Sequence, residues 1–321
     1  MTDRYARQTV LPEIGSAGQA RLAAARVLVV GAGGLGSPVL ATLAGAGTGH
    51  LTIVDHDRVE ESNLHRQPLY RMGDLGRLKA EAARDAVLAA NPTIAVAARP
   101  ARLGVADAPA LVAAADLVLD CADSLAVTYV LSDACYALGK PLVSASVLGL
   151  AGYVGAFGGR VPSYRAVFPD MPAIVGSCAV NGVLGSAVAV LGSLQAHMAL
   201  QILLGLEPSP LGRLVSVDLR TLSFGGFVFH DAVEPEGTAI PFVARGSLGP
   251  EDLVVELRGV EEAPEPVTAD ALRLGQDELD ALPSGRRVVL CCASGVRAHR
   301  AARRLAQRGI QDVAVLALSL G

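Results

Sequence analysis

The feature that most constrains the fold is a run of apolar residues followed at once by glycines, VLVVGAGGLG at residues 27–36. Four apolar residues in a row, three of them β-branched, predict a parallel strand that is buried on both faces. The glycines predict a tight turn into a helix that begins near Leu35. Backbone N–H groups in such a turn approach an anion without hindrance from Cβ, and the helix N-terminus adds about half a positive charge. The stretch is therefore typical of a phosphate cradle, with candidate binding residues Gly31, Gly33, Gly34 and Gly36.

Composition excludes several classes of protein. The 321 residues are 51% hydrophobic and include no Trp, which indicates a globular chain of one large or two modest domains. A net charge of −4 lacks the basic excess of a nucleic-acid-binding protein, so we expect a local anion site and no nucleic-acid partner. The first residues lack the apolar stretch of a secretory signal, and the five cysteines are odd in number. We therefore expect a cytoplasmic location with reduced thiols.

One apolar run has the length of a membrane span. Residues 171–206 contain no Asp, Glu, Lys or Arg, and 182–206 are mostly apolar. Three polar side chains, Gln195, His197 and Gln201, interrupt the run, and no basic cluster flanks it. We therefore interpret it as a fully buried helix, at a subunit interface, and expect no membrane partner.

Acidic residues follow the ends of two later predicted strands. Asp55 ends the strand 50–55 and lies 24 residues after Gly31, close to the spacing at which a carboxylate meets a ribose hydroxyl. Asp120 ends the strand 116–120, and Asp123 follows it. Carboxyl ends of parallel strands are where ligands bind in open α/β sheets, and one of these last two carboxylates could hold Mg²⁺. Helix capping remains the alternative for Asp55 and Asp123.

Two cations decide between kinds of nucleotide. Arg66 and Lys79 follow the Asp55 strand closely, and a triphosphate requires such charges whereas a nicotinamide cofactor does not. An NAD-dependent Rossmann oxidoreductase would explain the glycine turn and Asp55 but would leave Arg66, Lys79 and Asp123 without a role. Each cation alone could also be an ordinary solvated charge.

The remaining pattern predicts an α/β fold: a Rossmann-like ATP-binding sheet, mostly parallel with an antiparallel edge. Helices are expected at 37–46, 79–90, 108–115 and 125–138, and further strands at 93–98 and 141–145. Shorter β patterns at 152–157, 214–219 and 225–229 are expected to pair antiparallel at one edge.

Taken together, these residues resemble the ThiF/MoeB/HesA family, relatives of the ubiquitin-activating enzymes. The resemblance covers about residues 4–230 and rests on RYARQ at 4–8, GAGGLG, Asp55, NLxRQ at 63–67, Lys79, DxxD at 120–123 and CAVNGVLG at 178–185. It implies adenylylation, with Mg-ATP, of the C-terminal glycine of a small ubiquitin-like sulfur-carrier protein that ends in Gly-Gly. Pyrophosphate leaves, and the carrier is prepared for thiocarboxylation, with a sulfur donor such as a cysteine desulfurase.

The resemblance also implies individual roles: Asp55 at the ribose, Asn63 and Lys79 at the phosphates, Asp123 at Mg²⁺, and Arg66 and Arg7 reaching a phosphate from the partner subunit of a homodimer. Cys178 matches a position that carries an acyl or persulfide linkage in some relatives, and a small buried hydrophobe is the alternative.

The chain departs from the family pattern in three places. Many members hold a structural zinc with two cysteine pairs, but the corresponding residues 163–166 and 229–233 contain no cysteine, so we expect no zinc site. Ser124 stands where the family has Asn, and Thr128 stands where it has Arg. These two changes leave open a non-catalytic carrier-binding scaffold.

The C-terminal part has a different character. After the adenylylation domain at 1–230, we expect a linker at 231–250 and a small α/β unit at 251–321, with strands 252–257, 287–290 and 312–316 and a helix 296–308. Its centre, CASGVR at 292–297, resembles the Cys-x-x-Gly-x-Arg loop of rhodanese sulfurtransferases. Helix N–H groups near Cys292 would favour its thiolate, which makes it the candidate persulfide carrier, with an inert buried thiol as the alternative.

This rhodanese-like unit is shortened and diverged. Residues 255–258 read VELR where rhodaneses have Asp-Val-Arg, and no equivalent of their Gly-His-Ile-Pro-Gly-Ala stretch is recognisable. It is therefore expected to be a weak sulfurtransferase or a scaffold. The sequence does not specify the carrier or the pathway.

Overall fold

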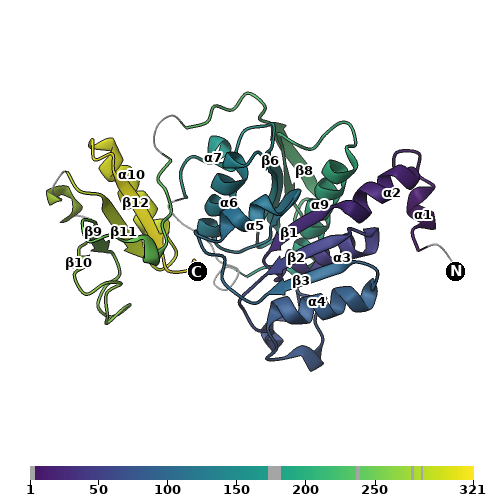
Figure 1. Ribbon diagram of the computed structural model, residues 1–321, viewed down its shortest axis with the longest axis horizontal. Coiled ribbons are helices and arrows are strands. Elements are labelled where there is room, and N and C mark those ends of the chain that lie inside the picture. Colours follow the sequence, from purple (N-terminus) through teal and green to yellow (C-terminus); the bar gives the residue numbers. More distant parts are fainter. Residues whose placement is uncertain (1–3, 173–181, 236–238, 276–277, 283–284) are drawn as a thin grey trace.

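The structure, a computed structural model, describes residues 4–321 except 173–181, 236–238, 276–277 and 283–284. Two sheets organise it: an eight-stranded sheet of order β3-β2-β1-β4-β5-β6-β7-β8 and a four-stranded sheet of order β10-β9-β11-β12. The smaller sheet lies at one end of the long axis, away from the N-terminal helices α1 (Ala6–Thr9) and α2 (Gly15–Ala24) (Figure 1).

The first five strands of the large sheet are parallel: β1 (Arg26–Val30), β2 (His50–Val54), β3 (Ala95–Arg99), β4 (Leu117–Asp120) and β5 (Pro141–Leu148). Val30 is in register with both Val54 and Asp120, so the segments that follow these strands begin at one edge. This register is what gathers the predicted site residues.

The last three strands form the antiparallel edge: β6 (Ala151–Gly158), β7 (Arg213–Asp218) and β8 (Ser223–Val228). The predicted fold class, a mostly parallel sheet with an antiparallel edge, is confirmed. Strand β5 extends three residues beyond the predicted 141–145, because it pairs with β6 along its whole length in a tight hairpin.

Helices cover both faces of the parallel part because alternate strand residues point to opposite sides. Val27 and Val29 of β1 pack in one core with α3 (Gly36–Ala46), α4 (Lys79–Ala90) and α9 (Gly185–Leu204). Leu28 and Val30 pack in the other core with α5 (Ala108–Ala113) and α6 (Leu125–Ala137).

Helix α9 was predicted to be fully buried, at a subunit interface. Within the single chain only half of its most apolar window is buried, and Val190 is 38% exposed, so full burial would need a second subunit and stays a prediction. The reason is that a single chain offers it neighbours on one side, chiefly α3, β5 and β6. Within the described residues it is the one helix whose length and composition would suit a membrane span, and a core helix passes the same test.

The C-terminal unit contains the parallel strands β9 (Leu253–Glu256), β10 (Leu272–Arg273), β11 (Val288–Cys292) and β12 (Val313–Ala317) and the helix α10 (Val296–Gln307). The two-residue strand β10 was not predicted, because two residues carry no alternation pattern. The predicted linker is partly structured: Phe242 is buried, and Val243 N donates to Val315 O of β12 at 2.9 Å.

One hydrophobic core runs through both units. It includes Val127 and Leu131 of α6 together with Leu290 of β11 and Leu305 of α10. Tyr129 of α6, Phe242 and His299 of α10 pack ring against ring at this boundary, with centroids 5.8 to 6.5 Å apart. Helix α10 therefore packs between its own sheet and the larger unit, and its Arg303 pairs with Asp170, which follows α7 (Tyr164–Val167).

Candidate nucleotide-binding site

The glycine turn between β1 and α3 packs against the end of β4. Gly31 has a φ of +96°, and a Cβ there would lie 2.5 Å from Cys121 O, so only glycine fits. A Cβ on Gly36 would lie 2.1 Å from Gly31 O. A Cβ on Gly33 would meet only Gln67 Nε2, at 3.7 Å, so the turn is open on that side.

Asp55 holds this turn against β2. One carboxylate oxygen accepts from Ala32 N at 2.7 Å and the other from Asp57 N at 2.8 Å. Burial raises the pKa of Asp55, while the two N–H donors and the charge of Lys79 act in the opposite direction. The residue is 9% exposed, so a small part of it remains accessible.

Lys79, the first residue of α4, brings a buried positive charge to the same place. Its side chain is 8% exposed, and Nζ lies 2.9 Å from Asp57 Oδ2. Burial opposes ionisation of Asp57, but the hydrogen bond and the charge of Lys79 outweigh it, and the pKa of Asp57 is lowered. Sequence reasoning missed Asp57, whose only signal was its position two residues after Asp55.

The segment between β2 and α4 lies beside the glycine turn. Asn63 is buried and accepts from Glu60 N at 3.3 Å, and Arg66 Nη1 donates to Ser62 O at 3.0 Å. A Cβ on Gly34 would lie 3.8 Å from Arg66 Cδ, so the arginine stem lies against the turn.

Gln67 is a site residue that sequence reasoning quoted only as part of the NLxRQ motif. It is 3% exposed, and its Oε1 has no hydrogen-bond partner in the described part of the chain. Its Nε2 faces Gly33. A buried amide with unused hydrogen-bonding capacity at this turn is a group that a polar ligand would satisfy.

The two carboxylates after β4 have different environments. Asp120 is fully buried, accepts from Ser144 Oγ at 2.8 Å and from Ala122 N at 3.2 Å, and contacts the Thr128 hydroxyl. Burial raises its pKa to about 6, against these hydrogen bonds. Asp123 is exposed, so of the two it is the one that a metal ion can reach.

One predicted residue, Arg7, does not lie at this edge. Arg7 is exposed on α1, beside α2 at the far end of the molecule from the C-terminal unit, so its predicted role needs a second subunit (Figure 1). Cys178 lies outside the described residues.

Cys292 ends β11 and is fully buried. Ala298 N of α10 donates to its Sγ at 3.4 Å, as expected for a thiol facing a helix N-terminus. The loop that follows packs on the large unit: a Cβ on Gly295 would lie 3.0 Å from Phe242 Cε1 and 3.5 Å from Ala126 Cβ of α6. Burial raises the pKa of neighbouring Cys291 to about 12, so Cys291 is a poor thiolate nucleophile at neutral pH.

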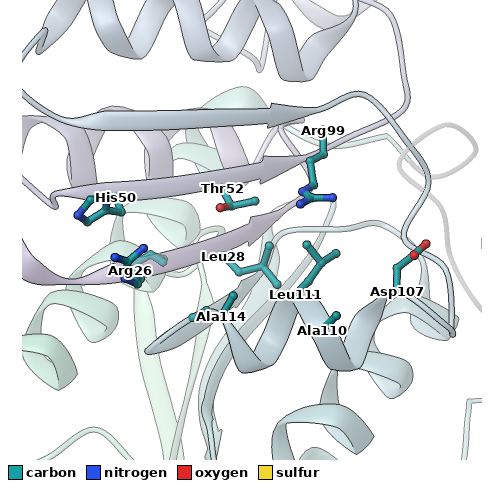
Figure 2. Close-up of a pocket in the computed structure, with 11 residues that line it drawn as sticks. Arg26, Leu28, His50, Thr52, Arg99, Asp107, Ala110, Leu111 and Ala114 are labelled. Atoms are coloured by element: carbon teal, nitrogen blue, oxygen red, sulfur yellow. The ribbon is translucent and has the colours of Figure 1, made fainter.

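A separate cavity of about 230 Å³ lies on the α5 face of the sheet. Figure 2 shows Arg26, His50, Thr52 and Arg99 on the strands and Ala110, Leu111 and Ala114 on α5, which covers this side of the sheet. None of the predicted site residues lines it.

The glycine turn, the carboxylate after β2 and the buried lysine together define a nucleotide-binding α/β protein. The model of the ThiF family matches residues 5–233, and the chain belongs to this family. It is 45% identical to the sulfur carrier protein adenylyltransferase of Thermus thermophilus, with 69% of this chain and 85% of that protein covered.

Two relatives have both activities in their names. The chain is 34% identical to the probable adenylyltransferase/sulfurtransferase MoeZ of Mycobacterium tuberculosis, over 96% of this chain and 89% of that protein. It is 43% identical to the adenylyltransferase and sulfurtransferase MOCS3 of Drosophila grimshawi, over 69% of this chain and 50% of that protein. The matched region thus spans only half the length of MOCS3.

Solved structures share the fold. Escherichia coli MccB with ATP superposes with a TM-score of 0.63 at 21% identity, covering 71% of this chain and 72% of that one. MccB with AMPCPP and MccA gives a TM-score of 0.62.

Proposed function

We propose that this protein is an ATP-dependent adenylyltransferase that activates the C-terminal glycine of a small ubiquitin-like sulfur-carrier protein. The observation that carries the proposal is the convergence of four groups at one sheet edge: the glycine turn, Asp55, the Lys79–Asp57 pair and the exposed Asp123. The names of the Thermus and MoeZ relatives support the same activity.

The residues present fit ATP and Mg²⁺. Gly33 leaves the turn open, and Gln67 offers a buried acceptor without a partner among the described residues. Asp55 would hold the ribose, and Asn63 and Lys79 would hold the phosphates. Asp123 would bind Mg²⁺ as an oxygen ligand, and the ion would reduce the negative charge of the triphosphate.

The chain's own part in the reaction is orientation and charge stabilisation. The carrier's terminal carboxylate attacks the α-phosphorus, a new oxygen–phosphorus bond forms, and pyrophosphate departs. Negative charge accumulates on the phosphate oxygens, where the buried ammonium of Lys79 would stabilise it. The stem of Arg66 lies against the glycine turn of its own chain, so we assign its guanidinium to the phosphates of that site in place of a partner subunit's. No general base is required, because the attacking carboxylate is already ionised at neutral pH.

A homodimer and a sulfur-transfer step complete the proposal. Arg7, remote from the site of its own chain, would reach the phosphates of a partner subunit, and the half-exposed α9 offers apolar surface for such an interface. Cys292 would carry persulfide sulfur from a donor such as a cysteine desulfurase. Because its thiol is fully buried, this role requires the loop at 293–297 to open.

Pyrophosphate exchange tests the adenylylation. With Mg²⁺, ATP and a carrier ending in Gly-Gly, the wild-type protein should incorporate labelled pyrophosphate into ATP, and Asp123→Ala should lose this exchange. A carrier truncated by its last two glycines is the matched control. Absence of exchange with every such carrier, or full exchange by Asp123→Ala, would overturn the proposal.

One specific observation supports a second candidate, a carrier-binding scaffold. Thr128 contacts the buried Asp120, so no arginine reaches the site from the position where the family has one. A scaffold would bind the carrier without catalysing exchange.

A further inference from the structure

Helix α9 packs closely against three segments of the proposed ATP site: the glycine turn, the start of α3 and the segment that carries Arg66. A Cβ on Gly192 would lie 2.7 Å from Leu35 O, at the start of α3, and one on Gly185 would lie 2.4 Å from His65 O. In the glycine turn itself, a Cβ on Gly34 would lie 2.8 Å from Cγ1 of Val188, which belongs to α9. The helix is therefore a common support for the turn, α3 and the segment that carries Arg66.

Its one fully buried polar side chain among the described residues extends this support to the end of β4. Gln195 is 0% exposed, and its Nε2 donates to Asp120 O at 2.7 Å and to Val143 O at 3.0 Å. Its Oε1 accepts from Cys121 Sγ at 3.4 Å. Both amide hydrogens are thus used on carbonyls of two adjacent strands, β4 and β5.

The peptide that Gln195 holds is the one on which the site depends. Asp120 O belongs to the peptide bond that leads into Cys121, and Cys121 O is the atom against which Gly31 packs. Two residues further on lies Asp123. A shift of this strand end would therefore move the glycine turn and the proposed metal ligand relative to each other.

General packing does not require an amide here. The helix is otherwise apolar on its buried side, and a buried amide is unfavourable unless it is hydrogen-bonded. The hydrogen bonds of Gln195 all go to the end of β4 and to the adjacent strand β5. Their partners lie 52 to 75 residues away in the sequence.

We infer that Gln195 is a positioning residue for Mg-ATP, because it fixes the end of β4 so that Asp123 and the glycine turn face the same triphosphate. This inference rests on the proposed function. Gln195 itself is buried beneath the site and acts through Asp123.

The experiment compares Gln195→Met with Gln201→Met in the full-length protein. Gln201 lies on the same helix, is partly exposed and makes no side-chain hydrogen bond in the described part of the chain, so it controls for the loss of one amide from α9.

Binding of a fluorescent ATP analogue is measured while free Mg²⁺ is varied, together with the KM for ATP, the KM for the carrier and the melting temperature. Gln195→Met should weaken Mg-dependent binding at least tenfold and raise the Mg²⁺ requirement, with the carrier KM unchanged. Gln201→Met should behave like wild type.

A double-mutant cycle separates positioning from a merely structural role. In the Asp123→Ala background, the Gln195 substitution should no longer change the Mg²⁺ requirement, because the ligand that it positions is absent. Gln195→Asn, which keeps the amide but shortens its reach, should show a smaller effect of the same kind and serves if the methionine variant does not fold.

A Gln195 variant with a lower melting temperature but wild-type affinity and Mg²⁺ requirement would overturn the inference. If the wild-type protein binds Mg-ATP but catalyses no exchange, adenylylation fails, and the binding measurements still decide the role of Gln195.

Discussion

Ser163 and Glu234 are joined by two hydrogen bonds: Ser163 N donates to Glu234 Oε1 at 2.6 Å and Ser163 Oγ donates to Oε2 at 2.7 Å. They connect the start of α7 to the segment after β8. Ser163 lies in the first of the two stretches where many ThiF-family proteins are expected to carry paired cysteines, and Glu234 directly follows the second, 229–233. Phe157 and Phe229 stack with ring centroids 5.0 Å apart. A carboxylate contact thus joins the two stretches here.

We therefore expect Glu234→Ala to lower the free energy of unfolding by about 1.5–3 kcal/mol, the range for charge-assisted hydrogen bonds. Denaturant unfolding measures the loss, and Glu265→Ala, at an exposed position, is the control. A zinc chelator should leave the melting temperature of the wild-type protein unchanged. A drop on chelation would show that a metal supports this region.

Lys79→Met should reduce pyrophosphate exchange about 10²- to 10³-fold, because it removes a buried charge next to the phosphates. Its partner Asp57 is 51% exposed and remains solvated, so the melting temperature should change little. The exchange rate and a thermal melt on the same sample make the comparison, and Lys140→Met is the charge-matched control. Equal exchange by the two variants would contradict the assigned role.

Asp120 should make folding stability fall as pH rises. Its folded pKa is about 6 and its unfolded value is 3.8, so the folded state binds the proton more tightly between these values. The contribution of protonated Asp120 to the free energy of unfolding is fully present below pH 3.8. It is lost as the pH rises through 6. Relative to wild type, Asp120→Asn should gain up to about 3 kcal/mol of stability across this window. Unfolding of both proteins at several pH values from 4 to 8 tests this, and a constant difference would contradict it.

The titration of His299 should make folding stability fall as the pH decreases, the opposite of the effect of Asp120. Burial, together with the cations Arg165 and Arg303, lowers its pKa from 6.5 to about 4, although Asp170 partly compensates. The unfolded chain therefore binds a proton that the folded chain does not, and stability falls as the pH drops from 6.5 through 4. His299→Phe keeps a ring between Tyr129 and Phe242 but does not titrate. Its loss of stability on acidification should be smaller by about 3 kcal/mol, and parallel acid curves would refute this account.

The parallel sheet and the position of its ligand edge could be predicted from the sequence. Strands such as 27–30 are continuous apolar runs, and parallel strands share one edge, which places the segments that carry Asp55 and Asp123 at the same edge of the sheet. Bonds between distant residues could not be predicted. The partners of Gln195 lie 52 to 75 residues away, and sequence alone gave only a polar residue in an apolar helix. The share of α9 that its own chain buries could not be predicted, because composition reports how apolar a helix is and gives no information on its neighbours.

The core shared by α6 and α10 bears on how the proposed sulfur transfer would be organised. Tyr129, Phe242 and His299 join the two units through packed rings, and Arg303 pairs with Asp170 at 2.5 Å. Cys292 therefore belongs to a unit that is packed against the larger one and does not move as a tethered domain. The distance between Cys292 and the glycine turn is fixed by the packing of the two units and not by the length of the segment between them. Lengthening the chain at 231–235 would therefore not bring the proposed sulfur-transfer and adenylylation sites closer together. The carrier's flexible tail would have to travel between them.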